Sequence, residues 1–299
     1  MALRDTQQNS NFHPNEFGKL QSVLLRHVRD AFGSTERINA QWQDLNYTQV
    51  PDEAEALAEY DAFAALIAST GCDIHYLPAD DTLTLDCLYV RDAAFPVPGG
   101  VVLCNMGKPA RSDEPTAMAR YLEENGIAVK GFIEGEGRLE GGDIVWLDSR
   151  TVVVGEGYRS NAEGIAQLKS FLGDSVDDLI KVPLPHWDGP SDVFHLMSMI
   201  SPLDKDLAVV YSKPMASVFR NYLVERGMEL VEVPDEEFYS MGCNVLAIAP
   251  REVIMIAGNP VTRSRLEGAG VTVHEYKGEE ISLKGLGGPT CLSRPLIRT

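Results

Sequence analysis

The stretch Gly142–Gly157, GDIVWLDSRTVVVGEG, decides the fold because it holds two short apolar runs separated by a polar turn. Both runs are rich in β-branched residues, which is typical of buried strands. A segment with helical periodicity follows at 160–173 (SNAEGIAQLKSFLG) and ends at a glycine, and a third β-rich run follows at 178–184 (DLIKVPL). The stretch therefore predicts one unit made of strand, turn, strand, helix and strand.

The same order of elements recurs along the chain at a nearly constant spacing. Polar residues mark the starts of successive units, and Asp92, Asp143, His195, Asn244 and Cys291 lie 51, 52, 49 and 47 residues apart in turn. Self-similarity at a fixed period is typical of repeat architectures. We therefore expect an α/β fold built as a ring of repeated units rather than as one doubly wound sheet.

A fifth unit would have to be shared between the two ends of the chain. We expect its opening part at 22–27 (SVLLRH) and its closing part at 287–298 (GGPTCLSRPLIR). Joining the ends in this way closes a ring without an exposed sheet edge. Because equivalent positions of a closed ring approach a common axis, we expect four of these residues to meet in one central cleft: Asp92, Asp143, His195 and Cys291.

Local patterns predict the remaining elements. Residues 52–69 form an alanine- and leucine-rich helix that Gly71 closes. Further strands are expected at 101–105, 207–212, 244–249 and 252–258, and further helices at 111–126, 213–227 and 261–270. No low-complexity segment divides the chain, so we expect one catalytic domain over residues 1–299, with 1–16 as a flexible N-terminus.

The charge composition limits the expected partners. The 299 residues include 26 Lys and Arg against 44 Asp and Glu, a formal net charge of −18. A surface this acidic repels phosphate backbones and anionic lipids, so we expect neither nucleic acid nor membrane as a partner. The charge suits a small cationic substrate, although solubility alone also accounts for it.

The lack of a targeting signal in the sequence and the spacing of the cysteines predict a cytoplasmic protein. No apolar run of the sequence approaches the ~18–20 residues that span a bilayer, and residues 1–17 lack the apolar core of a secretory signal. The five cysteines are scattered without a CxxC pair, which favours free thiols in a reducing compartment. We assign four of them to packing: Cys72, Cys87, Cys104 and Cys243.

Two residues are candidates for covalent catalysis. Cys291 follows the turn GGPT (287–290), where a ligand can reach a thiol, although a free cysteine is commonly a buried packing residue. His195 lies among apolar residues, where a satisfied core histidine is the ordinary alternative, and its place in the repeat favours catalysis. His186, in a loop, is the next candidate.

Carboxylates near the unit starts are candidates for binding a cation. Glu140 and Asp143 flank two glycines, whose lack of side chains would let a planar ligand lie against a carboxylate, while exposed acids in a turn are the alternative. Asp92 precedes an apolar strand in the same way, and Asp86 lies six residues earlier.

Two arginines are candidates for binding an anionic group of the substrate. Arg111 and Arg159 open predicted helices, where their charge opposes the helix dipole, and this favours use as carboxylate clamps over a place on the solvated surface. No Walker loop, GxGxxG junction, HExxH or paired CxxC occurs in the sequence, so we expect no nucleotide cofactor and no metal.

Six short motifs carry a resemblance to a known family. They are DCLYVRD (86–92), GKPAR (107–111), LEGGD (139–143), GEGYRSNAEG (155–164), FHL (194–196) and GGPTC (287–291). In order and spacing they resemble the guanidine-modifying superfamily with the five-bladed α/β propeller (pentein) fold, closest to the dimethylarginine dimethylaminohydrolases and next to the arginine deiminases. The resemblance covers about residues 17–297 and implies strand–strand–helix–strand repeats around a pseudo-fivefold axis.

The resemblance implies roles and a reaction. It implies Cys291 as nucleophile, His195 as acid–base group, Asp92 and Glu140 as guanidinium ligands, Arg111 and Arg159 as carboxylate ligands, Asp86 as α-amino ligand and Asp143 in support. The implied reaction hydrolyses a guanidinium C–N bond of arginine or N-methylated arginine. It gives citrulline and an amine or ammonia through a thiouronium on Cys291, without a cofactor or metal.

Several alternatives stay open at this point. Arg91 before Asp92 and the GGPTC motif lean toward the arginine deiminases, whereas the chain has no room for the helical insertion of those enzymes. An amidinotransferase, an arginine dihydrolase that gives ornithine, and a non-catalytic arginine-binding propeller are the other candidates. A homodimer is an open alternative to a monomer.

Overall fold

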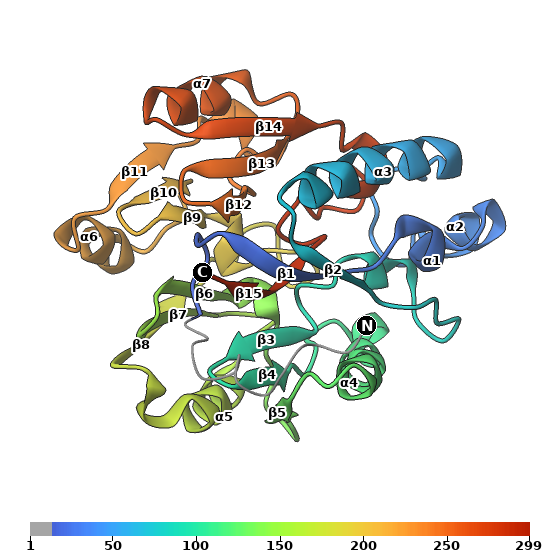
Figure 1. Ribbon diagram of the computed structural model, residues 1–299, viewed down its shortest axis with the longest axis horizontal. Coiled ribbons are helices and arrows are strands. Elements are labelled where there is room, and N and C mark those ends of the chain that lie inside the picture. The colour runs from blue at the N-terminus through green and yellow to red at the C-terminus, as the bar shows by residue number, and fades with distance from the viewer. Residues whose placement is uncertain (1–13) are drawn as a thin grey trace.

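The computed structural model describes residues 14–299. Within them, five three-stranded sheets surround a common centre, with the main helices at the periphery (Figure 1). This arrangement confirms the five-unit α/β propeller that the repeat and the resemblance predicted. Residues 1–13 of the expected flexible N-terminus lie outside the described residues. Residues 14–16 do not fit that expectation, because the Glu16 side chain is buried and paired with Arg91.

Four sheets are continuous in the sequence and share one internal pattern. The first strand of each runs antiparallel to the second, and a helix leads from the second to a parallel third strand. The strands are β3 (Ala94–Val97), β4 (Gly100–Leu103) and β5 (Val129–Phe132); β6 (Ile144–Asp148), β7 (Thr151–Glu156) and β8 (Asp178–Pro183); β9 (Ile200–Asp204), β10 (Leu207–Val210) and β11 (Glu229–Glu232); β12 (Leu246–Ala249), β13 (Glu252–Ile256) and β14 (Thr272–Tyr276).

The fifth sheet joins the two ends of the chain, as expected. Its strands are β15 (Arg294–Arg298), β1 (Leu20–Leu25) and β2 (Asp73–Tyr76), in that order. β15 is antiparallel to β1, and β1 is parallel to β2. The prediction reversed the two pieces: the C-terminal tail supplies the first strand of the unit, and the N-terminal segment supplies the second.

The predicted long helices are present, with shorter bounds for some. The helices are α1 (Val28–Phe32), α2 (Thr35–Gln41), α3 (Glu53–Ser69), α4 (Glu114–Glu124), α5 (Ala162–Leu172), α6 (Ser217–Glu225) and α7 (Pro260–Gly268). Asp52 caps α3, because its side chain accepts a hydrogen bond from the backbone N–H of Glu55 at 2.9 Å. α1 and α2 were not predicted, since each is too short to show a clear apolar period.

Side chains from neighbouring sheets interlock in the core. The ring of Phe95 in β3 stacks on that of Trp146 in β6, with centroids 5.7 Å apart. The Trp146 indole N–H donates to the Pro96 carbonyl at 3.3 Å, so the buried indole keeps a polar partner. Contacts of this kind fix the angle between blades. Among residues 14–299, no helix is long and apolar enough to cross a bilayer.

Candidate active site

The first segments of the blades meet at one cleft of about 250 Å³. Six of the predicted site residues line this cleft: Asp86, Asp92, Arg111, Arg159, His195 and Cys291. They lie in loops that belong to four of the five sheets, so the ring brings together residues that are far apart in sequence. The other two predicted residues, Glu140 and Asp143, are completely buried behind the cleft wall.

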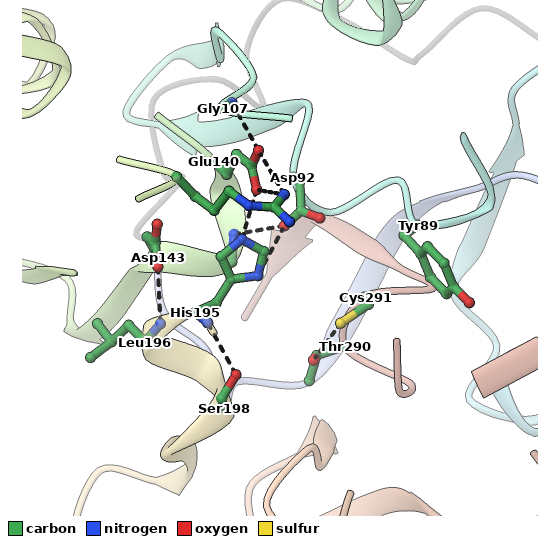
Figure 2. A network of polar contacts seen from close by, with 12 residues as sticks. Tyr89, Asp92, Gly107, Glu140, Asp143, His195, Leu196, Ser198, Thr290 and Cys291 are labelled. Carbon is green, nitrogen blue, oxygen red and sulfur yellow. Dashed lines mark hydrogen bonds and ion pairs between the residues drawn. The ribbon is translucent and has the colours of Figure 1, made fainter. Parts of the chain in front are cut away.

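His195 is held by a carboxylate behind it. Its Nε2 lies 2.7 Å from Glu140 Oε2, and its Nδ1 lies 4.0 Å from Asp92 Oδ1 (Figure 2). Burial alone would lower the pKa of His195, but the carboxylates of Asp92, Asp143 and Glu140 outweigh it and raise the pKa to about 9. The imidazole is therefore protonated at neutral pH.

Glu140 is the main anchor of this network. Burial would raise its pKa, but the hydrogen bond and charge of His195 lower it well below its usual range. Its Oε1 also accepts from the backbone N–H groups of Gly107 and Lys108 at 2.9 and 3.1 Å. Arg159 Nη1 lies 3.3 Å from both carboxylate oxygens. In this arrangement Glu140 faces His195 rather than the cleft.

Asp143 supports the backbone that carries His195. Its Oδ1 accepts from the Leu196 N–H at 3.0 Å, and its Oδ2 accepts from the Ser160 hydroxyl at 2.6 Å. Burial raises the pKa of Asp143 to about 6, against the opposing effect of His195. Its position agrees with the supporting role that the resemblance implied.

The two glycines before Asp143 serve a different purpose from the one predicted. A Cβ on Gly142 would lie 2.6 Å from His195 Nδ1 and 2.8 Å from Asp92 Oδ1. The Gly142 N–H also donates to Asp92 Oδ1 at 3.0 Å. The absence of a side chain on Gly142 thus makes room for His195 and Asp92. The sequence analysis had predicted that it makes room for a planar ligand, and the structure corrects this interpretation.

Cys291 is held in place by a residue to which the sequence analysis gave no role. Asn244 Nδ2 donates to Cys291 Sγ at 3.3 Å, while Asn244 Oδ1 accepts from the backbone N–H and the hydroxyl of Thr290 at 3.0 and 2.7 Å. A Cβ on Gly288 would collide with the Asn244 side chain at 2.5 Å. The sequence does contain a signal for this role, because Asn244 begins the fourth unit of the repeat.

The thiol of Cys291 differs from the other cysteine thiols in lining the cleft. Burial raises its pKa, the Asp92 carboxylate raises it further, and hydrogen bonds from Asn244 and Thr290 oppose the rise. Without a bound cation the group is therefore a thiol at neutral pH. Cys87, Cys104 and Cys243 are buried, and Cys72 is half-buried. None of these four lines the 250 Å³ cleft.

The two arginines precede their helices instead of opening them. Arg111 ends a short 3₁₀ turn at Pro109–Arg111, and α4 begins at Glu114, while Arg159 lies three residues before α5. The prediction placed both inside the first turn, and this was wrong. The Asn161 side chain caps α5 by accepting from the Gly164 N–H at 2.9 Å, whereas α4 has no side-chain cap and carries the acidic Glu114 in its first turn.

Arg111 is fully engaged in the ligand-free protein. Its Nε and Nη2 both lie 2.8 Å from the Glu114 carboxylate, Nη1 donates to Asp92 Oδ2 at 2.6 Å, and Nη2 donates to the Tyr89 carbonyl at 2.7 Å. Burial would lower the pKa of Arg111, but Glu114 and Asp92 raise it well above its usual value. Its predicted contact with a substrate carboxylate is not tested by this arrangement.

Asp86 lines the same cleft and is paired with a lysine. Lys108 Nζ is 2.6 Å from Asp86 Oδ2 and donates to the Leu45 carbonyl at 2.7 Å. Lys108 belongs to the GKPAR motif, but the sequence analysis gave it no role. His186, the alternative acid–base candidate, is exposed and bonded to the Tyr158 hydroxyl at 2.7 Å, and it lines neither cavity of the site.

A second cavity of about 290 Å³ shares Cys291 and His195 with the cleft. Aromatic and thioether side chains contribute much of its wall: Trp187, Phe194, Phe238, Tyr239, Met197 and Met241. Charged residues line both cavities, and Arg91, Asp188 and Asp192 belong to the wall of the second, but the second has the larger aromatic and thioether surface. Cys291 and His195 thus lie between a mainly polar compartment and a more apolar one.

Three groups of the site could together approach a metal ion. Ligand atoms of Asp92, Glu140 and His195 all lie within 4.8 Å of one another. Each carboxylate already has a cationic partner within the protein, because Glu140 accepts from His195 and Asp92 accepts from Arg111. The donor set therefore fits a protonated imidazole between carboxylates better than a metal ion.

Comparison with known proteins supports the resemblance found in the sequence. The family model described as "N,N dimethylarginine dimethylhydrolase, eukaryotic" matches residues 30–293. The uncharacterized protein YkgA of Bacillus subtilis (strain 168) is 26% identical over 288 residues, which cover 95% of this chain and 94% of that protein. The arginine deiminase of Listeria welshimeri is 27% identical over 250 residues, which cover 70% of this chain but only 61% of the deiminase.

A solved structure shows the same fold. The dimethylarginine dimethylaminohydrolase (DDAH) of Pseudomonas aeruginosa, solved as a cysteine-to-serine mutant in complex with citrulline, has a TM-score of 0.74 to this chain. The match has 23% identity and covers 94% of this chain and 100% of that one. With the family model spanning nearly the whole propeller, this chain belongs to the N,N-dimethylarginine dimethylhydrolase family, within the pentein superfamily of guanidine-modifying enzymes.

Proposed function

We propose that this protein is a cysteine-dependent hydrolase that cleaves a guanidinium C–N bond of arginine or N-methylated arginine. One observation carries the proposal: Cys291 and His195, from different blades, line the same cleft as the Asp92 carboxylate. Membership of the family and the arginine deiminase relatives support the same class of reaction.

The cleft suits a planar cation. A guanidinium is a poor electrophile because its charge is delocalised, so it must be fixed by charge-assisted hydrogen bonds before attack. Asp92 already accepts from Gly142 and Arg111, and each of its oxygens keeps a second lone pair for a substrate N–H. The bound cation would also favour the thiolate of Cys291, whose pKa burial and Asp92 otherwise raise.

In the first step the thiolate of Cys291 attacks the central guanidinium carbon and a C–S bond forms. The C–N bond to the departing nitrogen then breaks. The imidazolium of His195 donates its proton to that nitrogen, so ammonia or an amine leaves as a neutral molecule. The protonated state that the carboxylates impose on His195 in the ligand-free protein is the state that this step needs.

In the second step the neutral imidazole accepts a proton from water. The hydroxide attacks the same carbon of the thiouronium and forms a tetrahedral adduct. As the C–S bond breaks, the adduct loses its hydroxyl proton to solvent, so citrulline leaves and Cys291 is regenerated as a thiolate beside a protonated His195. Glu140 holds the ring at 2.7 Å in both steps and stabilises its charged form. We therefore assign Glu140 to positioning His195, in addition to the guanidinium contact that the resemblance implied.

The rest of the substrate would extend along the polar wall. Arg111 and Arg159 offer cationic groups for the α-carboxylate, and Asp86 offers an anionic group for the α-amino group. A carboxylate entering here would replace the contacts that Arg159 makes to Glu140 at 3.3 Å, which are long for charge-assisted hydrogen bonds.

The apolar cavity on the other side of the reactive pair favours an N-methylated substrate. Methyl groups on the departing nitrogen would contact apolar side chains of this cavity such as Phe194 and Trp187, although Asp188 and Asp192 also contribute to its wall. Plain arginine leaves this apolar surface unused. We therefore rank N-methylated arginine above arginine as the substrate.

A mass-spectrometric substrate screen tests the proposal. Purified protein would be incubated with arginine, monomethylarginine, dimethylarginine and agmatine, each with and without an amine acceptor. We expect citrulline plus the matching amine from a methylated arginine, and no product from Cys291→Ser. Absence of turnover with every guanidino compound, together with no adduct on Cys291, would overturn the proposal.

The products also separate the other members of the superfamily. Ornithine would indicate an arginine dihydrolase, and transfer of the amidino group to the added amine would indicate an amidinotransferase. Turnover of arginine faster than of its methylated forms would indicate an arginine deiminase and would contradict the ranking drawn from the apolar cavity.

A further inference from the structure

Three arginine side chains are buried together near the catalytic loops. Arg91 directly precedes Asp92, Arg294 begins β15, and Arg298 ends it. They are 1%, 2% and 5% exposed. Arg294 and Arg298 line neither of the two cavities of the site. The proposed reaction gives these two residues no function.

The charge of this arginine cluster is only partly compensated. Glu16 Oε2 accepts from Arg91 Nη2 at 2.6 Å, and this buried pair neutralises one arginine. Among residues 14–299, no carboxylate forms an ion pair with Arg294 or Arg298. Three arginines and one glutamate leave this cluster with a net positive charge, although the charge of Glu16 also acts on Arg294 and Arg298 and that of Asp92 acts on Arg294. A buried positive charge that lacks a close ion-pair partner is unfavourable.

The hydrogen-bonding groups of these two arginines are also incompletely used. Arg298 Nη1 donates to the carbonyls of Gly18 and Ala247 at 2.7 and 2.8 Å. The guanidinium carbon of Arg294 lies 6.0 Å from the centre of the Phe95 ring. Within the described part of the chain, the buried Nε and Nη2 of both arginines have no hydrogen-bond partner. Buried donors of this kind ordinarily find an acceptor.

Both arginines keep their charge at neutral pH. Burial lowers the pKa of Arg294 to about 9, with a further contribution from the charge of Arg91, and burial lowers that of Arg298 to about 10. Each value remains above neutrality. Deprotonation therefore does not remove the uncompensated charge, and a negative partner is required.

A small cavity adjoins the two side chains. It measures about 20 Å³, and its wall includes Arg294, Arg298 and Glu16 together with the apolar Pro96 and Trp146. A cavity needs roughly 10–15 Å³ to hold one water molecule, so this one admits a single ligand of about that size. A tetrahedral phosphate or sulfate is too large for it.

We propose that this cavity binds one small monovalent inorganic anion, of the size of chloride, through the unpartnered N–H groups of Arg294 and Arg298. Water would fit the space but would leave the two charges uncompensated. Glu16 does not oppose the anion strongly, because Arg91 already neutralises it at 2.6 Å. The cationic substrate of the neighbouring cleft would not compete for this site.

Thermal unfolding of the whole protein at constant ionic strength tests the proposal. Sodium chloride would replace sodium gluconate, whose bulky anion cannot enter the cavity. A ligand that binds only the folded state stabilises it by mass action. Above the dissociation constant, each tenfold rise in chloride should raise Tm by roughly 2–4 °C. A Tm that depends on ionic strength alone, whichever anion is present, would overturn the proposal.

Two variants locate the effect. Arg294→Met removes one charge and its N–H donors, so the dependence of Tm on chloride should disappear. Arg150→Met is the matched control, because Arg150 pairs with Asp177 on the exposed surface, and it should keep the full dependence. Equal chloride dependence in both variants would contradict the site.

Bromide provides a readout that does not depend on whether Arg294→Met folds. Crystals of the wild-type protein grown with bromide in place of chloride should show an anomalous peak between the Arg294 and Arg298 guanidinium groups. Density in the cavity without anomalous signal would identify water and would overturn the proposal.

Discussion

His195 is surrounded by three carboxylates, and this arrangement couples its protonation to folding. The pKa of a histidine is about 6.5 in an unfolded chain, while Asp92, Asp143 and Glu140 raise it to about 9 in the folded protein against the effect of burial. A raised folded-state pKa gives stability that is fully present below about pH 6.5 and is lost as the pH rises through about 9.

The first prediction is therefore a loss of stability in that pH window. The free energy of unfolding should fall by on the order of 3 kcal/mol between pH 6.5 and 9 because of His195 alone. Urea unfolding at several pH values would measure it, with His195→Gln as the comparison. In the variant, the free energy of unfolding should depend much less on pH between 6.5 and 9. An equal pH dependence in both proteins would contradict the prediction that the imidazole of His195 is charged in the folded state.

The second prediction concerns Cys291, whose thiol is the one cysteine sulfur among the described residues that lines the polar cleft. Cys291→Ser should reduce turnover by roughly 10³-fold or more, while the far-UV spectrum and Tm stay close to wild type. A thiol reagent should label Cys291 before the buried Cys87, Cys104 and Cys243, as peptide mass mapping would show. Cys72→Ser, at a half-buried site outside the cleft, should keep full activity.

The third prediction concerns Asn244, which binds both Cys291 Sγ and Thr290. Asn244→Ala should lower kcat about tenfold with little change in KM, the scale of one lost hydrogen bond of ~1 kcal/mol. Because the bond from Asn244 opposes the effects of burial and Asp92 on the pKa of Cys291, alkylation of the thiol should shift to higher pH. The control Asn125→Ala, at the end of α4, should change neither kcat nor the pH dependence of alkylation. A change in KM alone in Asn244→Ala would contradict the role of Asn244 in positioning Cys291.

Among the elements, the short turn at 141–143 leaves no room for a side chain on Gly142, whose Cβ would lie 2.6 Å from His195 Nδ1. The fourth prediction is that Gly142→Ala costs about 10²-fold in kcat/KM, because its Cβ would displace the His195 ring. Gly268→Ala, in α7 with nothing within 4 Å of the new Cβ, is the control and should be neutral or slightly stabilising. Kinetics and Tm of both variants would decide it, and a fully active Gly142→Ala would contradict the packing described.

The regular elements could be predicted from the sequence because local rules determine them. The helix at 52–69 has its cap, its period and its closing Gly71 within one segment, and it appears at Glu53–Ser69. The strands of the repeat are apolar enough to be recognised singly. The convergence of Asp92, His195 and Cys291 on one cleft also followed from the period, because equivalent positions of a ring must meet.

The partners of individual side chains could not be predicted, because they depend on contacts between blades. Nothing near Glu140 in the sequence indicates that it binds His195, which is 55 residues away. The pairing of Arg111 with Glu114 is local, at a separation of three residues, but its bond to Asp92 is not. The order of the strands in the split blade also depends on how the ring closes.

At the scale of the whole molecule, the ring is closed by pairing between the two ends of the chain. Lys19 and Thr299 exchange backbone hydrogen bonds at 2.9 and 3.0 Å, next to the β1–β15 ladder. The described ends of the chain are therefore adjacent in space. A covalent link between them would preserve the geometry of the split blade.

The fifth prediction is that a circular permutant folds and stays active. It would join Thr299 to Pro14 by a flexible linker and open the chain in the exposed turn between Gly135 and Glu136. Its Tm should lie within a few degrees of wild type, and its kcat should be similar. Deleting residues 294–299, which include β15, is the contrasting change and should prevent cooperative unfolding; a stable deletion variant would contradict the role of ring closure.

The split blade also sets the order in which the protein can assemble during synthesis. β1 is synthesised before its antiparallel partner β15, which begins 269 residues after β1 ends. At about 5–20 residues per second, β1 waits on the order of tens of seconds with one edge unpaired. Cys291 lies only three residues before β15. The proposed nucleophile is therefore delivered by the same event that closes the ring, and a nascent chain lacks the thiol of the cleft before that event.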